Sequence, residues 1–257
     1  MGFGGGFGGG FSQDSRPAVG GGDGATVTEL TIVPIIADSS LVYTESGGLL
    51  VGSGGALDGR EVQNFALFDS ITEYPDRFEF ILGDPGAHHY WGYTTAAPND
   101  AAALILGTCV GNSEVAVNFE SDAATLSRNI FAGKWSGNAN TDNDTRQVGA
   151  LYKDSIMYPR AMAFGAARLG TSHNPVPTWT DDQWIGFESI DGMCDWKWKE
   201  LEGDAWVTPD PDEWDCVGAQ SKLGVGFGAQ NGATSVLFIV YKITAAFYAS
   251  SELDALP

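Results

Sequence analysis

Short runs in which apolar and polar residues alternate make up most of the chain, and glycine-rich segments separate them. In residues 76–82 (DRFEFIL), Phe78, Phe80 and Leu82 share one face of an extended strand, because side chains of a strand alternate with a period of two. Further runs of this kind cover residues 25–36, 60–69 and 111–121. Pro34 interrupts the first of them, which predicts an edge strand or a bend. We count roughly eight to ten short strands, and they predict an all-β domain, a β-sandwich or jelly-roll-like fold.

The strand pattern is strongest near the C-terminus, where residues 223–230 and 235–248 flank Asn231 and Gly232. Asn-Gly predicts a two-residue hairpin between the two runs, because both central residues of a type I′ turn need positive φ. The second run is apolar on both faces, with Val236, Phe238 and Val240 on one and Leu237, Ile239, Tyr241 and Ile243 on the other. A strand of this kind needs cover on both sides, so we expect it inside a sandwich or beneath a subunit interface.

The first of these two runs carries Gly224, Gly226 and Gly228 on a single face. A face without side chains lets another group approach the backbone closely. We therefore expect a close packing contact there.

Helical signals are few. Asn99 or Asp100 can cap a short helix that begins within residues 100–107, and residues 148–168 have mixed helix and strand character. We predict one all-β domain over residues 25–257, with a subdivision open at the polar loop 136–146.

The N-terminal segment, residues 1–24, has a different texture from the rest. Phe3, Phe7 and Phe11 recur every four residues in a glycine background. Such a composition cannot bury enough surface to fold alone. The regular aromatic spacing favours an extended Gly/Phe-rich arm that orders when its phenylalanines dock on a neighbour, and the alternative is a disordered tail.

The charge balance is strongly acidic, with 13 Lys+Arg against 33 Asp+Glu and a net charge of −20. Nucleic acids and anionic lipid surfaces both require a basic face, so we expect neither as a partner. No apolar run approaches the length of about 18 residues that a membrane span needs, and we expect no span.

The cysteines, Cys109, Cys194 and Cys216, are too few for a disulfide framework. We favour three buried, unbridged cysteines, since cysteine packs as a small hydrophobe. A single Cys194–Cys216 bridge is the alternative.

Two acidic loops are candidate calcium-binding sites. Asn140, Asp142 and Asp144 alternate as in an EF-hand loop, but Thr145 and Leu151 stand where that motif needs Gly and Glu. The candidate calcium ligands are Asp142, Asp144, Asp210 and Asp212. We favour solvated loops, with calcium as the one cofactor left open and no other expected.

No motif for catalysis is present: neither zinc-ligand spacing nor a nucleophile elbow nor a phosphate-binding loop occurs. We therefore predict that the protein is not an enzyme.

Six of the eight tryptophans fall within residues 175–214. Aromatic rings stack on sugars, so Trp179, Trp184, Trp196 and Trp198 are a candidate glycan platform. A carboxylate pair such as Glu188 with Asp191 would extend this idea to glycan cleavage. The interpretation we favour is that these tryptophans fill the core and interfaces.

The arm, seen in residues 2–11, together with the β pattern resembles viral capsid and virion decoration proteins of the jelly-roll type. In those proteins a flexible terminal arm ties a β-domain to its neighbours. The acidic body is similar to virion proteins of marine or halophilic viruses. This resemblance implies a virion structural protein, located in the virion after assembly in the host cytoplasm, whose partners are copies of itself and other virion proteins. The alternative is a carbohydrate-binding or receptor-binding appendage that uses the tryptophans of residues 179–214, with a host-surface glycan as its partner.

If the arm is an assembly device, the full-length chain forms large closed species and a variant lacking residues 1–24 stays small, because the Phe anchors are gone. Mass photometry across a salt series measures this difference. Monomers of both proteins under every condition would contradict the assembly role.

Overall fold

The computed structural model describes the chain in segments, and the structural account is confined to them. They are residues 28–33, 42–43, 50–51, 61–64, 67–83, 102–108, 112–120, 128–136, 147–153, 156–163, 166–169, 183–190, 193–208, 214–215, 222–229 and 235–247. The predicted arm, with Phe3, Phe7 and Phe11, lies outside the described residues.

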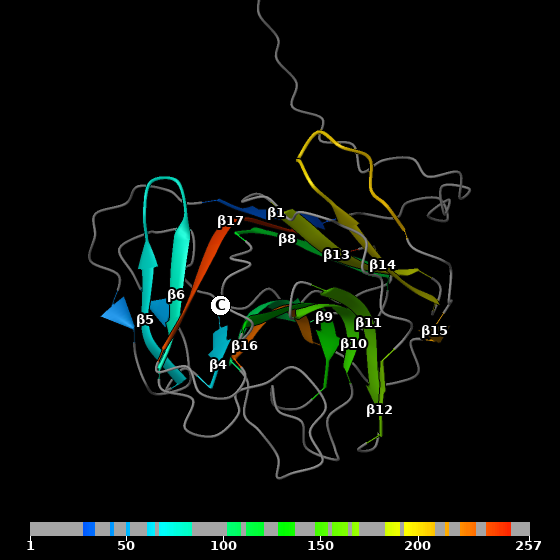
Figure 1. Cartoon of the computed structure of the whole chain (residues 1–257), viewed down its shortest axis with the longest axis horizontal. Helices are drawn as coiled ribbons and strands as arrows, with labels where there is room; N and C mark the ends of the chain where they lie inside the picture. Colours follow the sequence, from blue (N-terminus) through cyan, green and yellow to red (C-terminus); the bar gives the residue numbers. More distant parts are fainter. Residues whose placement is uncertain are drawn as a thin grey trace, which may run out of the picture.

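Two antiparallel sheets face each other as the layers of a β-sandwich (Figure 1). The first has eight strands, in the order β15 (Trp214–Asp215), β14 (Met193–Lys199), β13 (Gln183–Ile190), β8 (Ser113–Phe119), β17 (Val236–Phe247), β6 (Phe78–Leu82) and β5 (Phe68–Glu73), with β1 (Thr28–Ile32) also paired to β17. The second has seven, in the order β12 (Ala166–Leu169), β11 (Ile156–Ala163), β10 (Gln147–Lys153), β9 (Arg128–Trp135), β16 (Lys222–Ala229), β7 (Ala102–Thr108) and β4 (Glu61–Gln63). β2 (Val42–Tyr43) and β3 (Leu50–Val51) form a separate pair. The predicted all-β, sandwich or jelly-roll-like fold class is confirmed.

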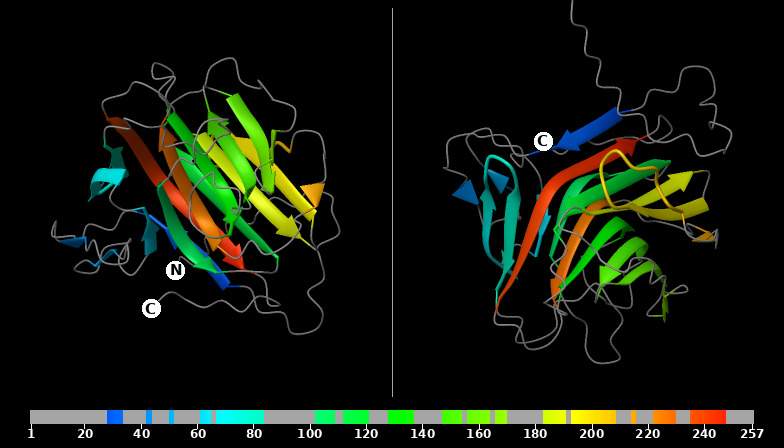
Figure 2. Two further views of the ribbon diagram at one scale, coloured as in Figure 1. Left: turned by 90° about the horizontal axis from the view of Figure 1, so that it is seen from below. Right: turned by 45° about the horizontal axis from the view of Figure 1, so that its top comes forward.

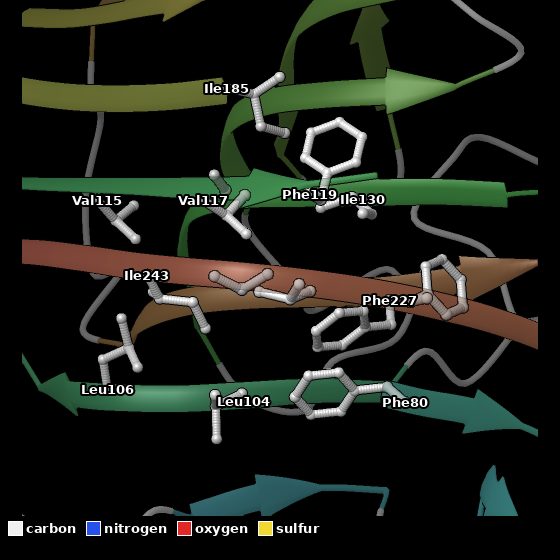
Figure 3. Packing of buried hydrophobic residues seen from close by; sticks show 14 of the residues in the cluster. Phe80, Leu104, Leu106, Val115, Val117, Phe119, Ile130, Ile185, Phe227 and Ile243 are labelled. Carbon is white, nitrogen blue, oxygen red and sulfur yellow. The ribbon is translucent and has the colours of Figure 1, made fainter. Parts of the chain in front are cut away.

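The core fills the space between the two sheets. Alternation puts Phe78, Phe80 and Leu82 of β6 into it, as the sequence predicts, and all three are fully buried. The ring of Phe80 stacks on that of Phe227 from the opposite sheet, with centroids 4.5 Å apart, and Phe227 also meets Phe238 of β17 edge-on at 5.4 Å. Figure 3 shows side chains of both sheets, among them Phe80 and Phe227, meeting in this layer. Aromatic contacts of this kind therefore join the two sheets across the core.

The predicted hairpin between the two C-terminal runs is wrong. β16 lies in the seven-stranded sheet between β9 and β7, whereas β17 lies in the eight-stranded sheet between β8 and β6 (Figure 2). Both runs bury an apolar face in the same core, and they do so from opposite layers. The connection therefore crosses from one sheet to the other, although its residues 230–234 lie outside the described part of the chain.

A β-bulge corrects the predicted faces of β17. Val236, Phe238 and Val240 are buried in the core as expected, but the register shifts between Val240 and Lys242. The shift turns Ile243 into the core, although strict alternation places it on the opposite face.

Two other predictions also fail. The expected helix start within residues 100–107 is strand β7, whose side chains from Ala102 to Gly107 are buried, so burial on both faces of a sheet outweighs the weak capping signal. The single strand expected over residues 60–69 is split into β4 and β5, in different sheets, around Asn64, whose φ of 54° breaks the extended chain.

The remaining strand expectations fall on strands. β1 pairs with β17 at the margin of its sheet, where an edge strand is expected. β9 and β10, which flank residues 136–146, pair with each other along their length. No helix that could cross a membrane occurs among the described segments.

The glycine face of β16 admits the close contact that the sequence predicts. The ring of Trp135 comes so near Gly224 that a Cβ there would lie 2.9 Å from Trp135 Cη2 and would overlap the carbonyl oxygen of Leu104. Trp135 is fully buried, and its indole Nε1 donates a 2.9 Å hydrogen bond to Gln63 Oε1. A second buried cluster thus lies on the outer face of the seven-stranded sheet, formed by Ala103, Ile105, Phe131, Trp135 and Leu151.

We expect Gly224→Ala to lower the free energy of unfolding by about 1–3 kcal/mol, because the backbone of Leu104 cannot yield as a flexible side chain would. Gly203→Ala is the matched control, since a Cβ on Gly203 meets nothing within 4 Å. Urea denaturation of both variants makes the comparison. Equal stabilities would show that β16 does not need its glycine face.

Candidate functional site

Four neighbouring strands present a regular grid of side chains on the outer face of the eight-stranded sheet. Ile185 and Phe187 of β13 face the core, so the residues between them face outward. From β17 through β8 and β13 to β14, the paired outward rows are Lys242–Asn118–Trp184–Lys199, then Thr244–Ala116–Gly186–Lys197, then Ala246–Glu114–Glu188–Asp195. The middle row has small residues on three of its strands, Thr244, Ala116 and Gly186.

The segment after β14, residues 200–208, folds back over this grid (yellow in Figure 1). Val207 and Trp198 exchange two backbone hydrogen bonds of 2.8 and 3.0 Å. The tip of the segment is a turn in which Leu201 N donates to Asp204 Oδ2 and Asp204 N to Leu201 O, both at 3.1 Å. This fold brings the ring of Trp206 above Gly186, where an added Cβ would lie 3.3 Å from Trp206 Cη2.

Two tryptophans and three lysines meet on this surface, which we call the lysine–tryptophan face: Trp184, Trp206, Lys197, Lys199 and Lys242. The two rings are nearly perpendicular, at 84° with centroids 6.3 Å apart. Lys199 Nζ lies 5.0 Å from the centroid of each ring, Lys197 Nζ lies 5.1 Å from that of Trp206, and Lys242 Nζ lies 5.8 Å from that of Trp184. All of these distances are within the range of cation–π attraction.

Lys197 is the buried cation of the face. Its Nζ donates to Glu114 Oε1 and, at 3.0 Å, to Glu188 Oε2. Glu114 is only 2% exposed, so this ion pair is shielded from water. Burial acts to lower the pKa of Lys197, but the two carboxylates outweigh it and the pKa is raised above its ordinary value. Lys197 therefore compensates two carboxylates that face each other on adjacent strands.

Lys199 and Lys242 have a different environment, because they share the exposed residue Glu202. Lys242 Nζ pairs with the Glu202 carboxylate, and Lys199 Nζ donates to the Glu202 carbonyl oxygen. Burial lowers the pKa of Lys199, and the neighbouring charge of Lys242 lowers it further, against the opposing effect of Glu202. The side chains of Lys242 and Glu202 are 27% and 64% exposed, so this end of the face opens to solvent.

The structure separates the predicted glycan platform into two faces. Trp184 belongs to the lysine–tryptophan face, whereas Trp196 is buried in the core and Trp198 packs against it. Trp179 lies outside the described residues, and so do the calcium candidates Asp142, Asp144, Asp210 and Asp212. Within the described segments, no group of three or more His, Cys, Asp or Glu residues could hold a metal ion.

Sequence reasoning missed the lysines of the face and the role of Trp206. The signal that could have found them is the run Trp196-Lys197-Trp198-Lys199, which alternates core tryptophans with outward lysines in a lysine-poor chain. That run could not have predicted the position of Lys242, because only the register between β17 and β8 brings Lys242 to the face.

The favoured interpretation of three unbridged cysteines is wrong, because Cys194 is disulfide-bonded. The position of its partner lies outside the described residues. β15, which pairs with β14 at Cys194, ends one residue before Cys216.

No family model and no curated protein matches the chain. Among solved structures, a protein of unknown function from Shewanella oneidensis MR-1 is similar over 87% of both chains, with a TM-score of 0.54 and 10% identity. The CBM2 module of the evolved Dit protein of Lactobacillus casei BL23 phage J-1 has a TM-score of 0.44 and 7% identity, over 74% of this chain and 90% of the module. The VIP36 exoplasmic/lumenal domain has a TM-score of 0.44 and 8% identity, over 70% of this chain and 83% of that domain. At these identities the likeness concerns the fold alone.

We expect Lys197→Met to lower the free energy of unfolding by about 3–5 kcal/mol, because it removes the ammonium group that pairs with the buried Glu114 carboxylate. The control is the double variant Lys197→Met with Glu114→Leu, which removes that buried charge and should recover much of the loss. Urea denaturation measures both. A single variant as stable as the parent chain would contradict the buried ion pair.

Proposed function

We propose that the protein is a non-catalytic carbohydrate-binding β-sandwich module that binds glycan on the lysine–tryptophan face. The observation that carries the proposal is the perpendicular Trp184–Trp206 pair with ammonium groups over both rings. The C–H face of a sugar packs on an electron-rich aromatic ring, and its hydroxyl groups need polar partners beside that ring. Trp206 and the adjoining lysine and glutamate side chains offer this combination.

The position of Trp206 also supports a surface-binding role. Its ring is half-buried on a segment whose other residues are exposed, including the large apolar residues Leu201 and Val207. The segment thus exposes apolar side chains beside the charged groups of the face. A glycan chain lying along the sheet could contact both the segment and the rows beneath it.

The carboxylates of the face argue against glycan cleavage. A glycosidase needs one carboxyl group that can donate a proton and a second that acts as base or nucleophile. Glu114 and Glu188 are instead both ion-paired with Lys197, and Glu114 is only 2% exposed, so this pair is not open to a glycosidic bond. We therefore retain the prediction that the protein is not an enzyme.

The spacing of Phe3, Phe7 and Phe11 favours a second candidate function, a virion structural protein with those residues as assembly anchors. The two candidates are compatible, because a capsid, decoration or appendage subunit can assemble through an arm and bind host-surface glycan through its β-domain. The arm-truncation experiment tests the second candidate by itself.

We expect Trp206→Ala to weaken glycan binding about tenfold or more, because the stacking ring is removed. Tyr74→Ala is the matched control, since Tyr74 is an exposed aromatic residue in the turn between β5 and β6 of the same sheet. A glycan array identifies the ligands, and calorimetry with the best of them gives the affinities. Near-ultraviolet circular dichroism checks that both variants are folded.

Two results would contradict the proposal. One is the absence of binding to any sugar on the array, and the other is an affinity that Trp206→Ala leaves unchanged.

A further inference from the structure

The lysine–tryptophan face gathers positive charge on a strongly acidic protein. The chain has only 13 Lys+Arg and a net charge of −20, yet three lysines surround two rings on this face. The positive charge of Lys197 is paired with the carboxylates of Glu114 and Glu188. The remaining positive charge of the face belongs to Lys199, which is buried, and to Lys242, whose side chain is 27% exposed.

These two lysines are held close together by features they share. Both ammonium groups lie over the ring of Trp184, and both contact Glu202, one through its carbonyl oxygen and the other through its carboxylate. Two neighbouring ammonium groups repel each other, and an anion that contacts both removes that repulsion. The pKa of Lys199 is lowered chiefly by burial, and the charge of Lys242 lowers it further against the opposing effect of Glu202.

We propose that this face binds an acidic glycan, whose carboxylate or sulfate group takes the place of the Glu202 carboxylate at Lys242. The inference rests on the proposed function and specifies its ligand class. In the structure, Glu202 occupies the position that the acidic group of the ligand would take.

The Glu202 carboxylate can leave that position at low cost. Its side chain is 64% exposed, and exposed ion pairs contribute little to stability because solvent screens them. The turn that carries it is closed by two local hydrogen bonds between Leu201 and Asp204, which do not involve the Glu202 side chain. The ligand group therefore exchanges with a solvated carboxylate and breaks no part of the core.

A further polar group lies on the face. Within the described part of the chain, the buried indole Nε1 of Trp184 has no hydrogen-bond acceptor. A buried donor without an acceptor is unfavourable, so a ligand oxygen that reached Trp184 would gain that interaction.

The acidity of the whole chain does not prevent binding of an acidic ligand. At physiological ionic strength charges are screened beyond about 8 Å, so distant carboxylates act weakly on a bound group. The lysines in direct contact with the ligand then determine its binding.

The test compares three probes of equal length: oligomers of galacturonate, of sulfated galactose and of neutral galactose. We expect the acidic oligomers to bind the full chain more tightly than the neutral one. Lys242→Gln should weaken binding of the acidic oligomers about tenfold or more, and by a clearly larger factor than binding of the neutral oligomer.

A more specific test is Glu202→Gln, which removes the carboxylate that pairs with the Lys242 ammonium group. It should strengthen binding of the acidic oligomers about twofold to fivefold. Glu200→Gln is its matched control, because it makes the same charge change in the same exposed turn, and in the described part of the chain Lys242 pairs with Glu202 rather than with Glu200. A preference for the sulfated or for the carboxylated oligomer identifies the acidic group, and either preference supports the inference.

The outcomes separate the inference from the proposed function. Equal affinity for neutral and acidic oligomers, with no effect of Lys242→Gln, overturns the acidic-ligand inference and leaves glycan binding intact. If Glu202→Gln and Glu200→Gln change the affinity for acidic oligomers equally, the ligand does not replace the Glu202 carboxylate at Lys242. No binding of any oligomer at millimolar concentration contradicts both proposals.

Discussion

A one-residue bulge in β17 is the constraint on which both the core and the candidate site depend. Up to Val240 the strand sends its even-numbered residues into the core, and beyond the shift it sends Ile243 and Ala245 there instead. The same change of phase places Lys242 on the outer face, opposite Asn118 and in the row of Trp184. Without the bulge, the Lys242 ammonium would point into an apolar interior, where a charge is very costly. One irregularity therefore keeps the core apolar and completes the lysine–tryptophan face.

In the proposed binding role, the lysines of the face fall into two groups, one structural and one for the ligand. Lys197 is buried between two carboxylates, and its charge is needed to keep Glu114 and Glu188 together on adjacent strands. Lys199 and Lys242 lie where the exposed turn of Glu202 meets the sheet. The tryptophan rings contact both groups of lysines, with the ammonium groups over their faces, and of the two rings only that of Trp206 is partly exposed.

Local patterns predicted the parts of the fold that depend on local physics. The alternation in β6 placed Phe78, Phe80 and Leu82 correctly, and the glycine face of β16 correctly indicated a close contact, made by Trp135. Predictions failed where distant strands decide the outcome. An Asn-Gly pair cannot reveal that its flanking strands join opposite sheets, and a run of residues cannot reveal its own bulge. The candidate site could not be predicted from the sequence for the same reason. Its residues become neighbours only through the register of four strands that are distant in the sequence.

The central claim is that glycan binds on the lysine–tryptophan face, at Trp206 and the adjacent buried Trp184, and the indole N–H signals of the tryptophans test it most directly. In a ¹⁵N-resolved NMR titration with an acidic oligosaccharide, we expect the signals of Trp184 and Trp206 to shift in a saturable way. The signal of Trp135, which is buried against the other sheet and hydrogen-bonded to Gln63, should stay fixed as an internal reference. Saturable shifts confined to other tryptophans, with those of Trp184 and Trp206 unmoved, would contradict the account.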